Sequence, residues 1–68
     1  MPKRLSSDEV TRILMQNGFA LVSQKGSHQK FRDATGRNAI VPSGRREIPM
    51  GTLASIIRQS GLRRDLFL

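Results

Sequence analysis

A chain of 68 residues without cysteine has room for one compact unit with a modest core, and disulfides and thiolate metal sites are excluded. Twelve lysines and arginines against five acidic residues give a formal net charge of +7, which favours a polyanion as partner. The carboxylates and the one histidine are scattered without the spacing of a metal site. We therefore expect a single domain over residues 1–68 that uses no metal ion and no cofactor.

The N-terminal stretch suggests where the protein resides. Met1-Pro2-Lys3-Arg4 is followed by no apolar run long enough for a signal peptide or a spanning helix, so a cytoplasmic location is expected. A role at a membrane surface is disfavoured as well, because neither predicted helix combines a lysine-rich polar face with bulky aromatic anchors.

The first predicted element is a helix. In Ser6-Ser7-Asp8-Glu9, the serine hydroxyl can accept from the glutamate amide while the glutamate carboxylate accepts from the serine amide, which is a capping box. Apolar residues follow at helical spacing from Val10 onward, and Gly18 can take the left-handed conformation that ends a helix. The pattern predicts a helix over Ser7–Asn17.

Two strands joined by a turn come next. Residues that favour strands occur from Phe19 to Gln24, Lys25-Gly26-Ser27 supplies a turn, and extended patterning resumes over Gln29–Arg32. Side chains alternate between the two faces of a strand, and Phe31 belongs in the core. The second strand is therefore predicted to carry His28, Lys30 and Arg32 on its outward face and Gln29, Phe31 and Asp33 on the other.

The second half of the chain completes a small α+β pattern. After a turn at residues 34–37, a third strand over Asn38–Val41 is expected to stop at Pro42, because proline cannot donate to a sheet ladder. A polar loop over Ser43–Glu47 precedes a second helix predicted over Pro49–Ser60. Two helices on one face of a three-stranded antiparallel sheet give the double-stranded-RNA-binding-domain-like fold.

The C-terminal tail is more apolar than a solvated terminus. Leu62 and Leu66-Phe67-Leu68 either fold back on the core or meet a partner, and the sequence leaves both alternatives open.

An ordered set of short motifs resembles the HicA (YcfA-like) toxin family from about Leu5 to Leu68. The motifs are Leu14-Met15-Gln16-Asn17-Gly18-Phe19, Gly26-Ser27-His28-Gln29-Lys30-Phe31, Val41-Pro42, Ile48-Pro49-Met50-Gly51-Thr52-Leu53 and Ile56-Ile57-Arg58-Gln59-Ser60-Gly61-Leu62. The resemblance implies a translation-independent mRNA interferase of a toxin–antitoxin system, in which the histidine of the Gly-Ser-His motif, here His28, is catalytic. It also implies a HicB-type antitoxin that binds the toxin and covers the active site.

One departure from the family pattern concerns a second histidine. Members often carry one shortly after the Val-Pro pair, whereas Pro42 is followed here by Ser43-Gly44-Arg45-Arg46. The chain therefore has no second histidine to act as an acid beside His28.

The chemistry of RNA cleavage can be matched to residues near His28. Attack by the 2′-hydroxyl requires a base, charge stabilisation at the phosphate and a proton for the leaving oxygen, and an imidazole with a reference pKa of about 6.5 suits both proton transfers. The candidates for binding the phosphates are Lys25 and Lys30, together with Gly26 and Ser27, which a turn would need in any case, and a track of arginines, Arg32, Arg37, Arg45 and Arg46. Surface charge alone is an equal explanation of the arginines, and Arg63 and Arg64 are interpreted as solubilising residues of the tail.

Base-specific reading is not expected. The three phenylalanines are assigned to the core and the tail, which leaves no stacking platform, so RNA recognition should be electrostatic and salt-dependent. Two other functions fit the sequence: an RNA-binding module without catalysis, and an interaction protein whose basic face meets an acidic protein.

Overall fold

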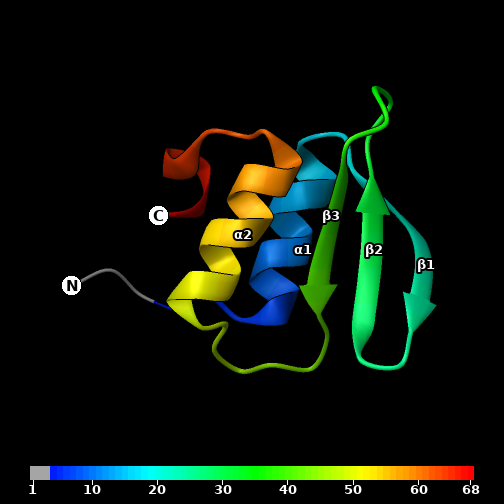
Figure 1. The fold of residues 1–68 in the computed structure, drawn as a ribbon. Coiled ribbons are helices and arrows are strands. Elements are labelled where there is room, and N and C mark those ends of the chain that lie inside the picture. The colour runs from blue at the N-terminus through cyan, green and yellow to red at the C-terminus, as the bar shows by residue number, and fades with distance from the viewer. Residues whose placement is uncertain (1–3) are drawn as a thin grey trace.

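The computed structural model describes residues 4–68 and has the predicted order of elements (Figure 1). Met1, Pro2 and Lys3, part of the stretch on which the cytoplasmic location was predicted, lie outside the described residues. The elements are α1 (Ser7–Gln16), β1 (Ala20–Lys25), β2 (His28–Arg32), β3 (Asn38–Pro42), α2 (Met50–Ser60) and a 3-10 turn, η1 (Arg64–Phe67). This arrangement confirms the α+β fold class expected from the sequence.

The capping box at the start of α1 is formed as predicted. The Ser6 hydroxyl accepts from the Glu9 amide at 3.1 Å, and the Glu9 carboxylate accepts from the Ser6 amide at 2.9 Å. Two amides at the start of the helix are thereby satisfied. Leu5 packs against the core cluster that contains Val10, as a hydrophobic staple requires.

The three strands form an antiparallel sheet in the order β1-β2-β3, and the register of β2 assigns its faces. Phe31 lies opposite Ala39, and Gln29 lies opposite Val41. Phe31, Ala39 and Val41 are all buried, so this face of the sheet is the core face. Because side chains alternate along a strand, His28 lies on the other, outward face.

One apolar cluster joins the sheet to both helices. Its buried members are Val10, Leu14, Phe19, Phe31, Ala39, Val41, Ile48, Leu53, Ile56 and Phe67. Since the strand members point to the core face, both helices bury their apolar stripes against that same face.

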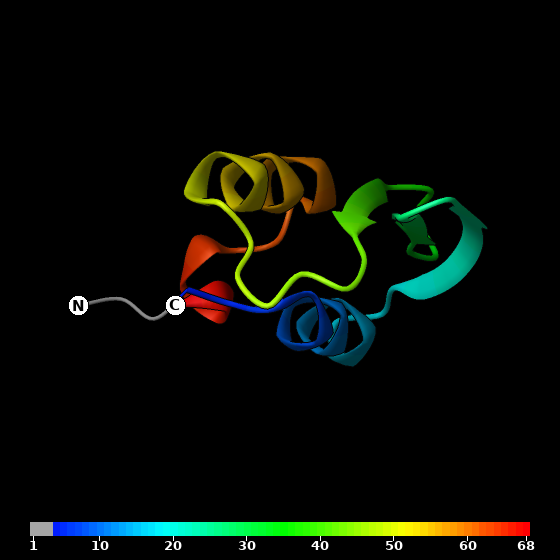
Figure 2. The ribbon, with the colours of Figure 1, turned by 90° about the horizontal axis from the view of Figure 1, so that it is seen from below.

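The helices do not cover the three strands equally. The second helix lies along β3, and the Gln59 side chain of α2 accepts from the Ile40 amide of β3 at 3.0 Å. Strand β1 is at the far side of the sheet from α2, as Figures 1 and 2 show, and all six of its residues are exposed. The large apolar residues of this strand, Leu21 and Val22, each remain 47% exposed.

The C-terminal tail folds back on the core. Phe67, in η1, is 2% exposed and belongs to the core cluster, and η1 contacts α1. The first of the two alternatives for the tail therefore holds for Phe67. Its neighbours Leu66 and Leu68 are exposed to 41% and 69%.

Small differences in element bounds have simple causes. Lys25, expected in the turn, is the last residue of β1 because it pairs with His28. Pro42, expected to stop the third strand, is its last residue, since the end of a strand does not require its amide. At the helices, Asn17 and Pro49 are cap residues just outside α1 and α2.

Candidate functional site

The outward face of the sheet is organised in cross-strand rows. The register places Lys25 of β1 and Pro42 of β3 on either side of His28. The next row along the sheet contains Ser23, Lys30 and Ile40. Directly opposed residues in an antiparallel pair lie about 5 Å apart, so Lys25 and His28 are close neighbours on the surface.

A two-residue turn positions the Lys25–His28 pair. Gly26 and Ser27 connect β1 to β2, and Gly26 has a φ of +58°. A positive φ at the first turn residue alone is the pattern of a type II′ turn, whose twist matches that of the flanking strands. Glycine at position 26 is thus explained by the turn itself, the reason that the sequence also offered for it.

His28 is open to solvent at this end of the sheet. Its side chain is exposed, and within residues 4–68 no hydrogen bond holds its ring. Strands β1 and β2 carry three cationic side chains, Lys25, Lys30 and Arg32, together with the imidazole of His28, and they carry no carboxylate. An anion that approaches this face therefore meets positive charge next to a proton acceptor.

The loop after β3 is anchored beside the same turn. The Ser43 amide donates to the Ser27 carbonyl at 2.6 Å, and the Ser43 hydroxyl donates to the same oxygen at 3.2 Å. These bonds tie the start of the arginine-containing loop to the β1–β2 turn, 16 residues away in the sequence.

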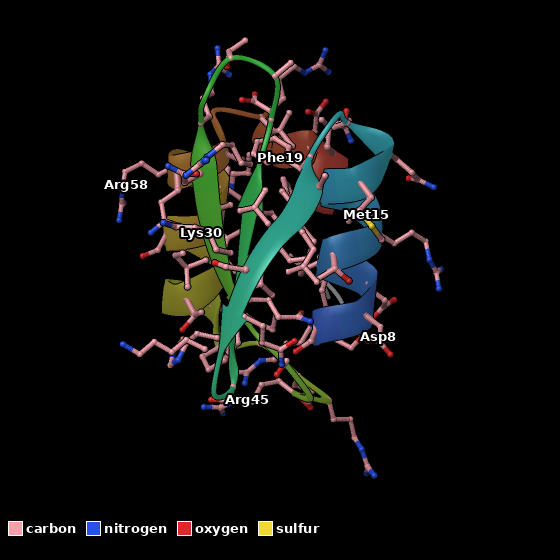
Figure 3. The ribbon with its side chains drawn as sticks, turned by 90° about the vertical axis from the view of Figure 1, so that its right-hand side faces the viewer. Asp8, Met15, Phe19, Lys30, Arg45 and Arg58 are labelled. Atoms are coloured by element: carbon pink, nitrogen blue, oxygen red, sulfur yellow. The ribbon has the colours of Figure 1, made fainter. Side chains whose placement is uncertain are left out.

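A buried hydroxyl attaches the rest of this loop to α1. The Ser7 side chain, 3% exposed, donates to the Pro42 carbonyl and accepts from the Arg45 amide at 2.9 Å. The Ser7 amide also donates to the Arg45 carbonyl at 2.9 Å. Figure 3 shows Arg45 at the end of the sheet where the β1–β2 turn lies.

The structure brings most of the predicted site residues to one end of the sheet. Lys25, Gly26, Ser27 and His28 form the turn region, and Arg45 joins them through the anchored loop, which also contains Arg46. Lys30 is two residues along β2, about 7 Å from His28 on the same face, and is half-buried.

Two predicted arginines are placed elsewhere. Arg32 lies at the opposite end of β2, about 13 Å from His28 at strand spacing, and its guanidinium donates to Asn38 at 2.8 Å. The Arg37 guanidinium donates at 3.5 Å to the Ser60 carbonyl, near the end of α2, where a cation complements the helix dipole. Of the tail residues, Arg63 is paired with Asp65.

Asp33 makes the far end of β2 electrostatically different from the His28 end. Desolvation opposes ionisation of Asp33, but hydrogen bonds from the Thr35 hydroxyl and from the Arg37 and Thr35 amides outweigh it and lower the pKa of the carboxyl group. This carboxylate stays charged just beyond Arg32, whereas Lys25, His28 and Lys30 have no acidic neighbour on β1 or β2.

Sequence reasoning missed the residues that hold the site in place. Ser7 and Ser43 fix the loop, and Pro42 flanks His28 across the strand pair. The contacts of Ser7 span 35 and 38 residues, and no local pattern indicates pairs so distant. Arg58 of α2 was not among the predicted site residues, yet Figure 3 shows it and Lys30 on the side of the molecule away from α1.

The fold and this surface define a class of small basic α+β proteins, built like double-stranded-RNA-binding domains, that present one histidine among lysines on an open sheet face. A family model described as the HicA toxin of bacterial toxin–antitoxin systems matches residues 7–62, which is most of the chain. The chain therefore belongs to the HicA toxin family. No significant match was found among curated proteins.

Family membership defines the general role. The chain is a toxin of a toxin–antitoxin system, and a partner antitoxin is implied. In the part of the chain that the structure describes, neither helix is both long and apolar enough to cross a membrane.

Proposed function

We propose that this toxin is a metal-independent endoribonuclease that cleaves mRNA with His28 as its one catalytic residue and thereby inhibits translation. One observation carries the proposal: the only histidine of the chain is exposed on the open sheet face, directly opposite Lys25 and on the same face as Lys30. The chain acts as one RNA-binding nuclease domain in the cytoplasm, and a HicB-type antitoxin restrains it by covering this face.

The proposed reaction is an internal transfer at phosphorus. The imidazole of His28 takes the proton of a ribose 2′-hydroxyl, the 2′-oxygen bonds to phosphorus, and the bond from phosphorus to the 5′-oxygen breaks. The departing 5′-oxygen takes a proton from the imidazolium or from water. The products are a 2′,3′-cyclic phosphate and a 5′-hydroxyl end.

Lys25 and Lys30 are proposed to stabilise the charge that develops on the phosphate. On the outward face, Lys25 lies directly across the strand pair from His28, and Lys30 lies two residues along the same strand. A single positioned base contributes about 10²–10⁴ in rate, so this arrangement supports a modest nuclease. Cleavage of even a few sites per message is enough to stop translation of that message.

RNA is proposed to bind through its backbone. All three phenylalanines are 3% exposed or less, so they offer no ring on which a base can stack. The phosphate contacts are then Lys25 of the turn region, Lys30 of β2, and Arg45 and Arg46 of the anchored loop. Arg32 belongs to this set only for an RNA that extends along the whole of β2.

A second candidate function keeps the binding surface and removes the catalysis. Within residues 4–68 no hydrogen bond orients the His28 ring, whereas catalytic histidines are commonly held by a partner. In that case the chain is an RNA-binding module that acts by occupying its RNA.

Cleavage of a long single-stranded RNA in EDTA by the native chain and by His28→Ala distinguishes these functions. Gln16→Ala, an exposed change on α1, is the matched control for expression and folding. We expect the native chain and Gln16→Ala to cut at equal rates and His28→Ala to be slower by about 10²–10⁴. Circular dichroism and an RNA titration on each variant check that folding and binding are kept.

The ends of the cleaved RNA test the mechanism itself. New 5′ ends should accept phosphate from polynucleotide kinase without phosphatase treatment, because they are hydroxyls. Cutting by His28→Ala at the native rate would contradict the role of His28. Binding without cutting by the native chain would establish the second function instead.

A further inference from the structure

The two outer strands of the sheet differ in how their edges are covered. The edge of β3 is protected by α2, whose Gln59 side chain accepts from the Ile40 amide. On β1 every residue is exposed, and Figure 3 shows this strand unobstructed, with α1 beside it. An uncovered edge strand presents unpaired backbone groups that can pair with another strand.

The hairpin register identifies one residue of β1 whose backbone amide and carbonyl lie on this open edge. Lys25 and His28 flank a two-residue turn, so their amides and carbonyls bond to each other. Backbone groups alternate in direction along an antiparallel strand, so the amide and carbonyl of Gln24 point away from β2. A strand that adds to β1 would find them there.

Apolar side chains accompany this edge. Leu21 and Val22 of β1 are each 47% exposed, and Met15 of α1 is 55% exposed. Leu21 pairs with buried Phe31 and so lies on the core face, on the side of the sheet where α1 packs. Figure 3 shows Met15 on α1, the helix next to β1 in this view. An added strand with apolar residues at alternate positions would cover part of this surface.

The charges on β1 and β2 indicate what kind of strand can add to the edge of β1. Strands β1 and β2 carry only cationic charged residues, Lys25, Lys30 and Arg32, with His28 beside them. A second copy of this chain would bring another net charge of +7 against the first, which disfavours pairing of two β1 strands. A segment that alternates acidic with apolar residues matches both faces of β1.

We propose that β1 is a docking edge for an extended acidic segment of the partner antitoxin, which adds to the sheet as a fourth strand through the Gln24 backbone. This inference rests on the proposed function, because it specifies how the partner reaches the RNA-cleaving face. Acidic side chains of the fourth strand would lie in the rows of Lys25 and Lys30. The segment would thus neutralise the groups that hold RNA phosphates and leave the His28 ring without substrate.

A seven-residue synthetic peptide of sequence TEVEVET, blocked at both ends, is the probe, and TKVKVKT is its charge-reversed control. Titration into the ¹⁵N-labelled full chain, followed by NMR, reports binding residue by residue. We expect saturable shifts of the Val22 and Gln24 amides with the acidic peptide and none with the basic peptide.

Two substitutions at one position separate backbone pairing from side-chain contact. Gln24→Pro removes the outward amide, which an edge strand tolerates, and should weaken peptide binding by about tenfold or more. Gln24→Ala keeps the amide and should bind within about twofold of the native chain. Thermal unfolding and the spectrum of each variant show that the sheet is intact.

Several outcomes would overturn the inference. The absence of shifts at millimolar peptide, or equal affinity of Gln24→Pro and the native chain, would contradict strand addition. Self-association of the free chain that Gln24→Pro abolishes would make a second copy the occupant. None of these outcomes depends on cleavage activity, so failure of the nuclease and failure of strand addition can be told apart. A chain that cuts no RNA but binds the peptide through β1 would refute the proposed nuclease and keep β1 as a docking edge.

Discussion

The two faces of β2 differ in what they contribute: the core face stabilises the fold, and the outward face carries the proposed chemistry. On the core face Phe31 is 2% exposed and belongs to the core cluster that includes residues of both helices, whereas His28, three residues earlier on the outward face, is open to solvent. The alternation of side chains assigns every second residue to each task. Substitutions on the two faces should therefore have separate effects, on folding for one face and on RNA for the other.

The largest expected effect is on the core face. Phe31→Ala removes a buried ring and should lower the free energy of unfolding by about 3–5 kcal/mol, which is most of the stability of a domain this small. His28→Ala on the opposite face should change it by less than about 0.5 kcal/mol. Urea unfolding of both variants measures the contrast, and similar losses in the two would show that the faces are not independent.

The next effect tests whether a buried residue can act on both folding and RNA binding. Ser7→Ala removes the hydroxyl that links α1 to Pro42 and Arg45, and should cost about 1–3 kcal/mol of unfolding free energy. Because the loop is then less well anchored, RNA affinity should fall as well. Thr11→Ala, which removes an exposed hydroxyl from the same helix, should change neither quantity. Unchanged RNA affinity in a folded Ser7→Ala would mean that the loop arginines do not contact RNA.

A smaller effect is expected on the salt dependence of RNA binding, which tests the electrostatic role of the outward face. Lys30→Ala should reduce the slope of log affinity for single-stranded RNA against log salt by about 0.7, the value of one lost phosphate contact. Arg12→Ala removes an equal charge from the exposed side of α1 and should leave the slope unchanged. RNA titrations at several salt concentrations give both slopes. Equal reductions would indicate binding by net charge rather than by the sheet face.

The smallest effect concerns the far end of β2. Hydrogen bonds from Thr35 and Arg37 lower the pKa of Asp33 in the folded chain despite some desolvation, so the carboxylate stabilises the fold above the pKa of the unfolded chain. This contribution is lost as the pH falls through the lowered pKa. Asp33→Asn should be less stable than the native chain at neutral pH, and the difference should disappear as the pH falls through the lowered pKa of Asp33. A difference that persists in acid would show that the charge of Asp33 is not its cause.

Much of the fold could be predicted because its signals are local. The capping box at Ser6, the glycine turn at Gly26 and the period-two alternation around Phe31 each act within a few residues, and each is present in the structure. The clustering of Lys25 with His28 was predicted for the same reason, since a hairpin joins residues that are near in sequence. The resemblance of the motifs to HicA toxins is confirmed by the family match.

The sequence by itself determined the order of the elements, the face on which His28 lies and the family of the protein. Only the tertiary structure decided that the Arg45 loop is anchored to α1 through Ser7, that Arg32 and Arg37 are engaged away from His28, and that β1 keeps an open edge. The physical reason is the range of the interactions. Caps, turns and alternation depend on neighbours in the chain, whereas loop anchoring and edge coverage depend on which distant segments the packed core brings together.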